Sequence, residues 1–129
     1  MLAAIHDLSA EQNSEYTVTF QYFDSEDAAI DILADYDNVR FVVRRSSLPQ
    51  EKNLFEVSYD DSAVEGYLPF PISESYGSLV ITNQQMQITV NTETMSSVYP
   101  GNYFYYVFLE TNSGVSDCLI RGKFTVEAP

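Results

Sequence analysis

The chain has 129 residues, the length of one domain, and its 6 Lys and Arg against 19 Asp and Glu give a formal net charge of −13. This charge excludes nucleic-acid binding by a basic face and disfavours an anionic membrane surface, because both would repel the chain. Hydrophobic residues make up 45% of the sequence and aromatic residues 14%, which indicates a packed globular domain rather than a disordered acidic tail.

Residues 1–10 are expected to form an N-terminal arm or a first edge strand, ahead of a single β-sandwich domain over residues 11–129. The arm lacks the cationic region and apolar run of a signal peptide, and no stretch approaches the about 18 apolar residues of a membrane span. The single cysteine, Cys118, excludes an intramolecular disulfide and a cysteine-based zinc site. Burial and hydrogen bonds must therefore stabilise the fold, which fits assembly in a reducing cytoplasm.

Apolar and polar residues alternate with a period of two along much of the chain, the pattern of half-buried β-strands. Such runs cover residues 16–23, 39–44, 54–59, 79–90 and 120–126. β-Branched and aromatic residues dominate them, as strands prefer. A polar Asn83-Gln84-Gln85 interrupts the run at 79–90, which predicts a hairpin with a short loop.

Helical signals are scarce. Residues 25–36 fit a single helical turn with Ser25 as its N-cap, although the alternation at residues 30–32 also allows a short strand. Residues 91–98 fit one further turn, which Pro100 would end.

Seven to eight short strands joined by short connections predict an all-β fold, an immunoglobulin-like antiparallel two-sheet sandwich. The connections are too short for the crossover helices that a parallel sheet needs. Pro100-Gly101-Asn102-Tyr103 opens the strongest strand and resembles a tyrosine corner, in which the phenol hydroxyl donates to upstream backbone. The cysteine pair and core tryptophan of antibody domains are missing, so the domain is not of the antibody type.

No residue pattern for catalysis is present. The only histidine is His6, near the terminus, and neither a G-x-S-x-G nor an H-E-x-x-H motif occurs. A nucleophile would therefore lack a base beside it, and we expect no enzyme and no cofactor. A hydrolase that uses an Asp/Glu pair remains as a weak alternative, because some of 19 acids will be neighbours by chance.

One acidic cluster raises the question of calcium. It consists of Asp24, Glu26, Asp27, Asp31, Asp35 and Asp37. Calcium needs several oxygens from a compact loop, but the spacing and glycine of an EF-hand are absent. A solvated acidic turn is the favoured reading, and no metal site is predicted.

The charges are unevenly distributed. Residues 1–37 hold nine acids and no Lys or Arg. Arg40 and Arg44 share one strand face, as do Arg121 and Lys123. These cations are either ordinary outward-facing residues or one half of a contact in which the acidic pole of one subunit meets a basic patch on a partner.

The strand at residues 102–111 is apolar on both faces, although a sandwich strand needs only one apolar face. One reading is that a loop at residues 65–77 of the same chain covers the second face. The other reading is that another protein covers it, since Tyr and Phe are enriched in interface cores. Exposed tyrosines that stack on sugar are a third reading. The predicted interface residues are Phe104, Tyr106, Phe108, Tyr67, Phe70, Arg40 and Arg44.

Five segments carry a resemblance to a known family. They are Glu11-Gln12-Asn13-Ser14-Glu15-Tyr16, Ala29-Ile30-Asp31-Ile32-Leu33, residues 39–46, Pro100-Gly101-Asn102-Tyr103-Phe104-Tyr105 and residues 119–126. Their order and spacing over residues 11–126 resemble the small immunoglobulin-like domain of tailed-phage virion proteins. That family includes the N-terminal domain of baseplate upper proteins.

The resemblance implies a non-enzymatic virion structural or adaptor protein of the tail, baseplate or neck, assembled in the host bacterial cytoplasm. Its expected partners are other virion proteins and copies of itself in a symmetric assembly, with no nucleic acid and no membrane. The N-terminal arm would then pair with a neighbour's sheet edge. The alternatives are a capsid decoration protein and a host-glycan or receptor-binding module.

Overall fold

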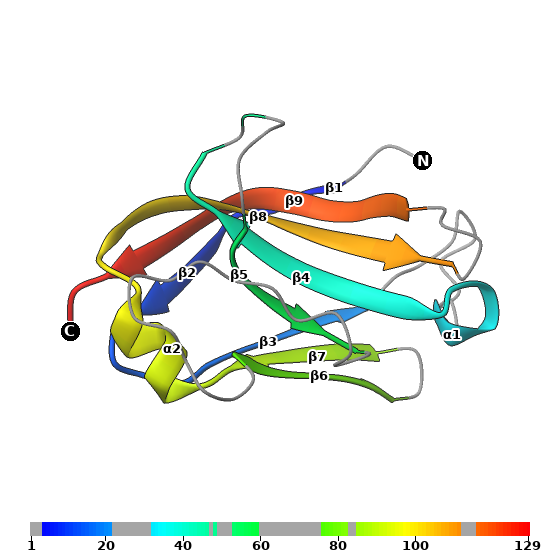
Figure 1. Ribbon diagram of the computed structural model, residues 1–129, viewed down its shortest axis with the longest axis horizontal. Helices are drawn as coiled ribbons and strands as arrows, with labels where there is room; N and C mark the ends of the chain where they lie inside the picture. Colours follow the sequence, from blue (N-terminus) through cyan, green and yellow to red (C-terminus); the bar gives the residue numbers. More distant parts are fainter. Residues whose placement is uncertain are drawn as a thin grey trace.

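The computed structural model describes residues 4–21, 32–46, 48, 53–59, 76–82, 85–111 and 116–129. Within these residues the chain forms two facing β-sheets and two short helices (Figure 1). The larger sheet has the order β1 (Ala4–Ile5), β9 (Ser116–Glu127), β8 (Gly101–Glu110), β4 (Asn38–Arg44), β5 (Asn53–Ser58), and β2 (Leu8–Glu11) also pairs with β9. The smaller sheet has the order β3 (Tyr16–Gln21), β7 (Gln85–Val90), β6 (Gly77–Thr82). The predicted all-β two-sheet sandwich is confirmed.

The N-terminal segment departs from the antiparallel expectation. β1 and β2 pair in parallel with β9, Ala4 opposite Ile120 and Leu8 opposite Phe124. Both pairs keep the same register, so β1 and β2 are one interrupted strand. Parallel pairing needs no crossover helix in this case, because the rest of the domain connects the first strand to the last. The arm therefore lies on the edge of its own sheet.

The strand formed by β1 and β2 is interrupted at His6 and Asp7, where the backbone of the arm passes close to Gly122 of β9. A Cβ atom on Gly122 would lie 2.2 Å from the carbonyl oxygen of His6, so only glycine fits below the arm. The phenol of Tyr105 donates to the same His6 carbonyl, and Asp7 Oδ1 accepts from the Lys123 N–H at 2.9 Å. The Tyr105 phenol and the Asp7 carboxylate thus replace backbone hydrogen bonds between the arm and β9 at this point.

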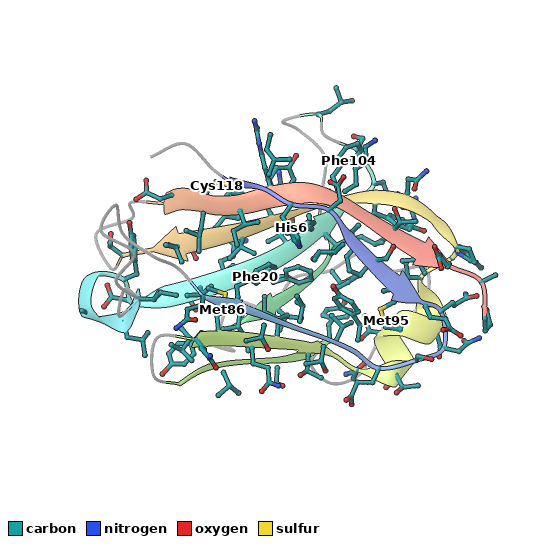
Figure 2. The ribbon with its side chains drawn as sticks, turned by 180° about the vertical axis from the view of Figure 1, so that it is seen from behind. His6, Phe20, Met86, Met95, Phe104 and Cys118 are labelled. Carbon is teal, nitrogen blue, oxygen red and sulfur yellow. The ribbon has the colours of Figure 1, made fainter. Side chains whose placement is uncertain are left out.

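Aromatic rings form the centre of the core between the sheets. Phe124 contacts Tyr16, Phe41 and Phe55 with ring centroids 5.3, 6.1 and 6.5 Å apart, and Phe41 lies 5.7 Å from Tyr105. The three contacts of Phe124 are edge-to-face, an arrangement that stabilises beyond simple burial. Methionines fill the space around them, and Figure 2 shows Met86 on the inner side of the smaller sheet. This cluster provides the cross-sheet packing that a disulfide provides in antibody domains.

Three local predictions are confirmed. β6 and β7 form the hairpin, with Thr82 opposite Gln85. Helix α2 (Thr92–Ser97) begins at Asn91, whose Oδ1 accepts from the Thr94 N–H at 2.8 Å, as an N-cap does. The Tyr103 hydroxyl donates to the Tyr99 carbonyl at 2.6 Å, which is the tyrosine corner.

Helix α1 (Ile32–Asp35) is a single turn inside the segment predicted to be helical or strand-like. The predicted N-cap, Ser25, lies outside the described residues. Of the acidic cluster, so do Asp24, Glu26, Asp27 and Asp31.

Strand β5 overturns one expectation. All six of its residues are buried, including Glu56 at 0% exposure, whereas the alternation predicted a half-buried strand. Glu56 lies opposite Val42, and Arg40 of β4 binds its carboxylate. The alternation could not reveal this burial, because the cation that makes it possible is on another strand.

Candidate functional site: the outer face of the larger sheet

The predicted interface residues that the structure describes lie on one surface. Tyr106 is opposite Val42 and Arg121, and Phe104 is opposite Arg44 and Lys123, so these side chains project to the same side. We call this surface, which faces away from the smaller sheet, the outer face. Figure 2 shows Phe104 on this side of the larger sheet. The outer face comprises Arg40, Val42, Arg44, Phe104, Tyr106, Phe108, Arg121 and Lys123.

Strand β8 divides its rings between the core and the outer face. Tyr105, Val107 and Leu109 are completely buried between the sheets. On the other side, Phe104, Tyr106 and Phe108 are each only half-buried. A minor part of each ring therefore remains in contact with solvent, whereas Val42 on the same face is completely buried.

Two of these outer rings form an ordered pair. The rings of Tyr106 and Phe108 stack with centroids 5.7 Å apart and an interplanar angle of 11°. The Arg44 guanidinium carbon lies 5.1 Å from the Tyr106 centroid and 5.9 Å from that of Phe108, and its Nε donates to Asn53 Oδ1 at 2.9 Å. Each cation–π contact contributes about 0.5–1 kcal/mol at an exposed site, so the two rings are held in place before any partner binds.

Arg40 is engaged within the chain. It binds the buried carboxylate of Glu56, and its NH1 lies 3.2 Å from Glu110 Oε2. Burial lowers the pKa of Arg40, but the hydrogen bonds and negative charges of the two glutamates outweigh it, so the pKa lies above its ordinary value. The second carboxylate oxygen of Glu56 is buried and has no hydrogen-bond partner among the described residues. Arg40 therefore neutralises two glutamates of its own sheet and does not present a free cation to a partner.

A pocket of about 230 Å³ opens on the same surface, beside the stacked rings. Its walls come from the arm and from the two strands next to it. They are Ile5, Phe104, Tyr106, Arg121 and Gly122. Ile5 is 73% exposed, unusual for an isoleucine next to an apolar hollow.

Burial favours the neutral forms of two tyrosines of the core and of the single cysteine. Burial raises the pKa of Tyr16 to about 12, and burial also raises the pKa of Tyr105 above its ordinary value. Burial raises the pKa of the Cys118 thiol, which keeps it protonated and a weak nucleophile. No three His, Cys, Asp or Glu side chains gather in a metal-binding group in the part of the chain that the structure describes.

Of the seven predicted interface residues, the structure brings five to one face, while two residues that line the pocket beside them were not predicted. Phe104, Tyr106, Phe108, Arg40 and Arg44 share the outer face. Tyr67 and Phe70 lie outside the described residues, as does most of the loop that was expected to cover this face. Ile5 and Gly122 were missed, and the only sequence signal for them is a glycine inside a strand, which often marks a close backbone approach.

Comparisons with known proteins support the fold. No protein-family model and no curated protein matches the chain. Two chains of a marsupial T cell receptor superpose with TM-scores of 0.54 and 0.52 at 10% sequence identity. Each match covers 94% of this chain but only 50% and 48% of the receptor chains, so this chain spans about half their length.

A further match is the extracellular domain of the voltage-gated sodium channel beta4 subunit, described as a parallel homodimer in cell–cell adhesion. It has a TM-score of 0.45 at 10% identity and covers 100% of this chain and 96% of that domain. The chain has an immunoglobulin-like β-sandwich fold. No helix among the described residues has both the length and the apolar composition to cross a membrane.

Proposed function

We propose that this chain is a non-enzymatic docking module that binds other proteins through its outer face. The observation that carries this proposal is the stacked Tyr106–Phe108 pair held by Arg44 on a partly exposed surface. Aromatic residues and arginine are enriched at interface hot spots. Because the rings are already ordered, Tyr106 and Phe108 lose little further side-chain entropy when a partner binds them.

We further propose that the module works in a tailed-phage particle, as a structural or adaptor protein of the tail, baseplate or neck. The support is the resemblance of residues 11–126 to the immunoglobulin-like virion family, together with an outer face suited to contact. In that setting the partners are other virion proteins and copies of the chain, related by the particle's symmetry. A position on the capsid surface is the alternative.

Particles that carry a tagged copy of the chain test both parts of this proposal. The double variant Tyr106→Ser/Phe108→Ser removes the stacked pair, and Val80→Ser is the matched control, because Val80 is a 49% exposed residue on the smaller sheet. Loss of one hot spot costs about 2 kcal/mol or more, so retention of the double variant should fall at least about thirtyfold. Val80→Ser should be retained like the wild type.

The outcomes separate the two parts. A folded double variant that stays on the particle would refute the outer face as the docking surface. Absence of the wild-type chain from purified particles would refute the virion setting. Binding of the wild type to a glycan array, lost on Tyr106→Ser, would replace protein docking with sugar recognition.

A further inference from the structure

The pocket beside the stacked rings has the size of a side-chain site. Its volume of about 230 Å³ lies below the range of about 300–1,000 Å³ that is typical of small-molecule sites. Ile5 and Phe104 supply apolar walls, and the backbone at Gly122 adds no side chain to fill the space. One large apolar side chain of a partner fits such a hollow better than a cofactor does.

Among the described residues, the charged side chains around the pocket are three cations and one carboxylate, that of Asp7, whose Oδ1 accepts from the Lys123 backbone N–H at 2.9 Å. Arg121 lines the pocket, and Lys123 and Arg44 both lie opposite Phe104 on the adjacent strands. Within the described residues, no carboxylate lies within 4.0 Å of these three cations. Glu56 and Glu110 are buried and half-buried residues of the same sheet. Arg40 binds both of their carboxylates.

This local charge opposes the charge of the whole chain. A net charge of −13 repels acidic molecules at long range. At physiological ionic strength, however, exposed charges act over about 8 Å, so a short segment seated in the pocket responds mainly to the cations at its rim. The pocket is therefore a locally basic site on an acidic protein.

We propose that this pocket binds an acidic segment of a partner protein, which inserts one apolar side chain between Ile5 and Phe104 and places a neighbouring carboxylate on Arg121. The inference rests on the proposed docking function and names the chemistry of the partner. Arginine suits this role because its planar guanidinium binds a carboxylate with two parallel hydrogen bonds. A second copy of the chain is a different occupant, which the sedimentation measurement below distinguishes from an acidic segment.

Three blocked pentapeptides provide the probes, in 0.15 M salt and with amide and isoleucine-methyl NMR as the readout. They are Asp-Glu-Leu-Glu-Asp, its neutral counterpart Asn-Gln-Leu-Gln-Asn, and Asp-Glu-Ala-Glu-Asp without the anchor. The first should shift the resonances of the pocket residues Ile5, Phe104, Arg121 and Gly122. The neutral peptide should bind about threefold or more weakly, as expected for exposed ion pairs, and the alanine peptide about tenfold or more weakly.

Two variants locate the contact. Arg121→Gln removes the charge of an exposed residue and should reduce affinity for the acidic peptide about threefold or more, with no change for the neutral one. Arg45→Gln removes an equally exposed charge outside the pocket and should have no effect.

Several results would overturn the assignment. They are unshifted pocket resonances with all three peptides, equal binding of the acidic and neutral peptides, and a wild-type dimer in sedimentation that Arg121→Gln dissociates. Failure of the peptides while particle retention still needs Tyr106 and Phe108 would remove the pocket assignment and leave the docking function standing. If the peptides bind but the double variant stays on the particle, the docking function is removed and the pocket assignment is left standing.

Discussion

The two faces of β8 carry similar side chains in different surroundings. On the inner face, Tyr105, Val107 and Leu109 have no exposed surface, and the ring of Phe41 packs against Tyr105. On the outer face, Tyr106 and Phe108 stack on each other under an arginine and remain partly exposed. Aromatic content alone therefore does not separate core from contact surface.

The two faces of β8 differ in the groups that their side chains contact. The inner side chains meet other apolar groups in the core between the sheets, so their burial stabilises the fold. The outer rings of Tyr106 and Phe108 meet Arg44 of the same sheet, which holds them in place while part of their surface stays exposed. We expect substitutions on the inner face to change stability, and those on the outer face to change binding.

The largest effect is expected for Phe41→Ala in the core. Phe41 is fully buried and contacts three other rings, so truncation should reduce the free energy of unfolding by about 3–5 kcal/mol. Phe108→Ala on the outer face should cost only about 1 kcal/mol, because the ring is half-buried. Urea unfolding measures both. Equal losses would contradict the division between the two faces.

The second-largest effect is expected for the buried carboxylate of Glu56, which lies opposite Val42 of the outer face. Arg40→Met leaves Glu56 buried without its cation and should cost about 3 kcal/mol, near the lower end for such pairs since Arg40 is 24% exposed. Glu56→Gln removes the charge that needs a partner and should cost about 1 kcal/mol. Thermal and urea unfolding of both variants test the order. A more stable Arg40→Met would show that the ion pair is dispensable.

The third effect concerns the arm that carries Ile5 to the outer face. Gly122→Ala places a methyl group 2.2 Å from the His6 carbonyl oxygen, so the arm must move away from β9 at a cost of about 1–3 kcal/mol. Amide hydrogen exchange at Leu8 and Ala10 should accelerate. Ser9→Ala, an exposed change on the same strand, should leave it unaltered, and unchanged exchange in Gly122→Ala would contradict the crossing.

The smallest effect is at the rim of the inner face. Tyr103→Phe removes the hydrogen bond to the Tyr99 carbonyl and should cost about 0.5–1 kcal/mol. Tyr99→Phe keeps that carbonyl, and its own ring is 60% exposed, so it serves as the control. Chemical denaturation resolves the difference. Equal stability of Tyr103→Phe and the wild type would mean that the corner adds nothing to the fold.

Local pattern predicted much of this molecule. The period of two marked the strands, Asn91 and Pro100 framed α2, and Pro100-Gly101-Asn102-Tyr103 marked the tyrosine corner. These features depend on residues a few positions apart, so the sequence contains the whole interaction. The two apolar faces of β8 were visible for the same reason.

The sequence by itself determined an all-β sandwich without a disulfide, with an aromatic strand apolar on both sides. Only the tertiary structure decided the parallel pairing of the arm with β9, the burial of Glu56 against Arg40, and the pocket that joins Ile5 to Arg121. Each of these joins different strands, some more than 100 residues apart, and no local periodicity carries information on which distant strand becomes the neighbour.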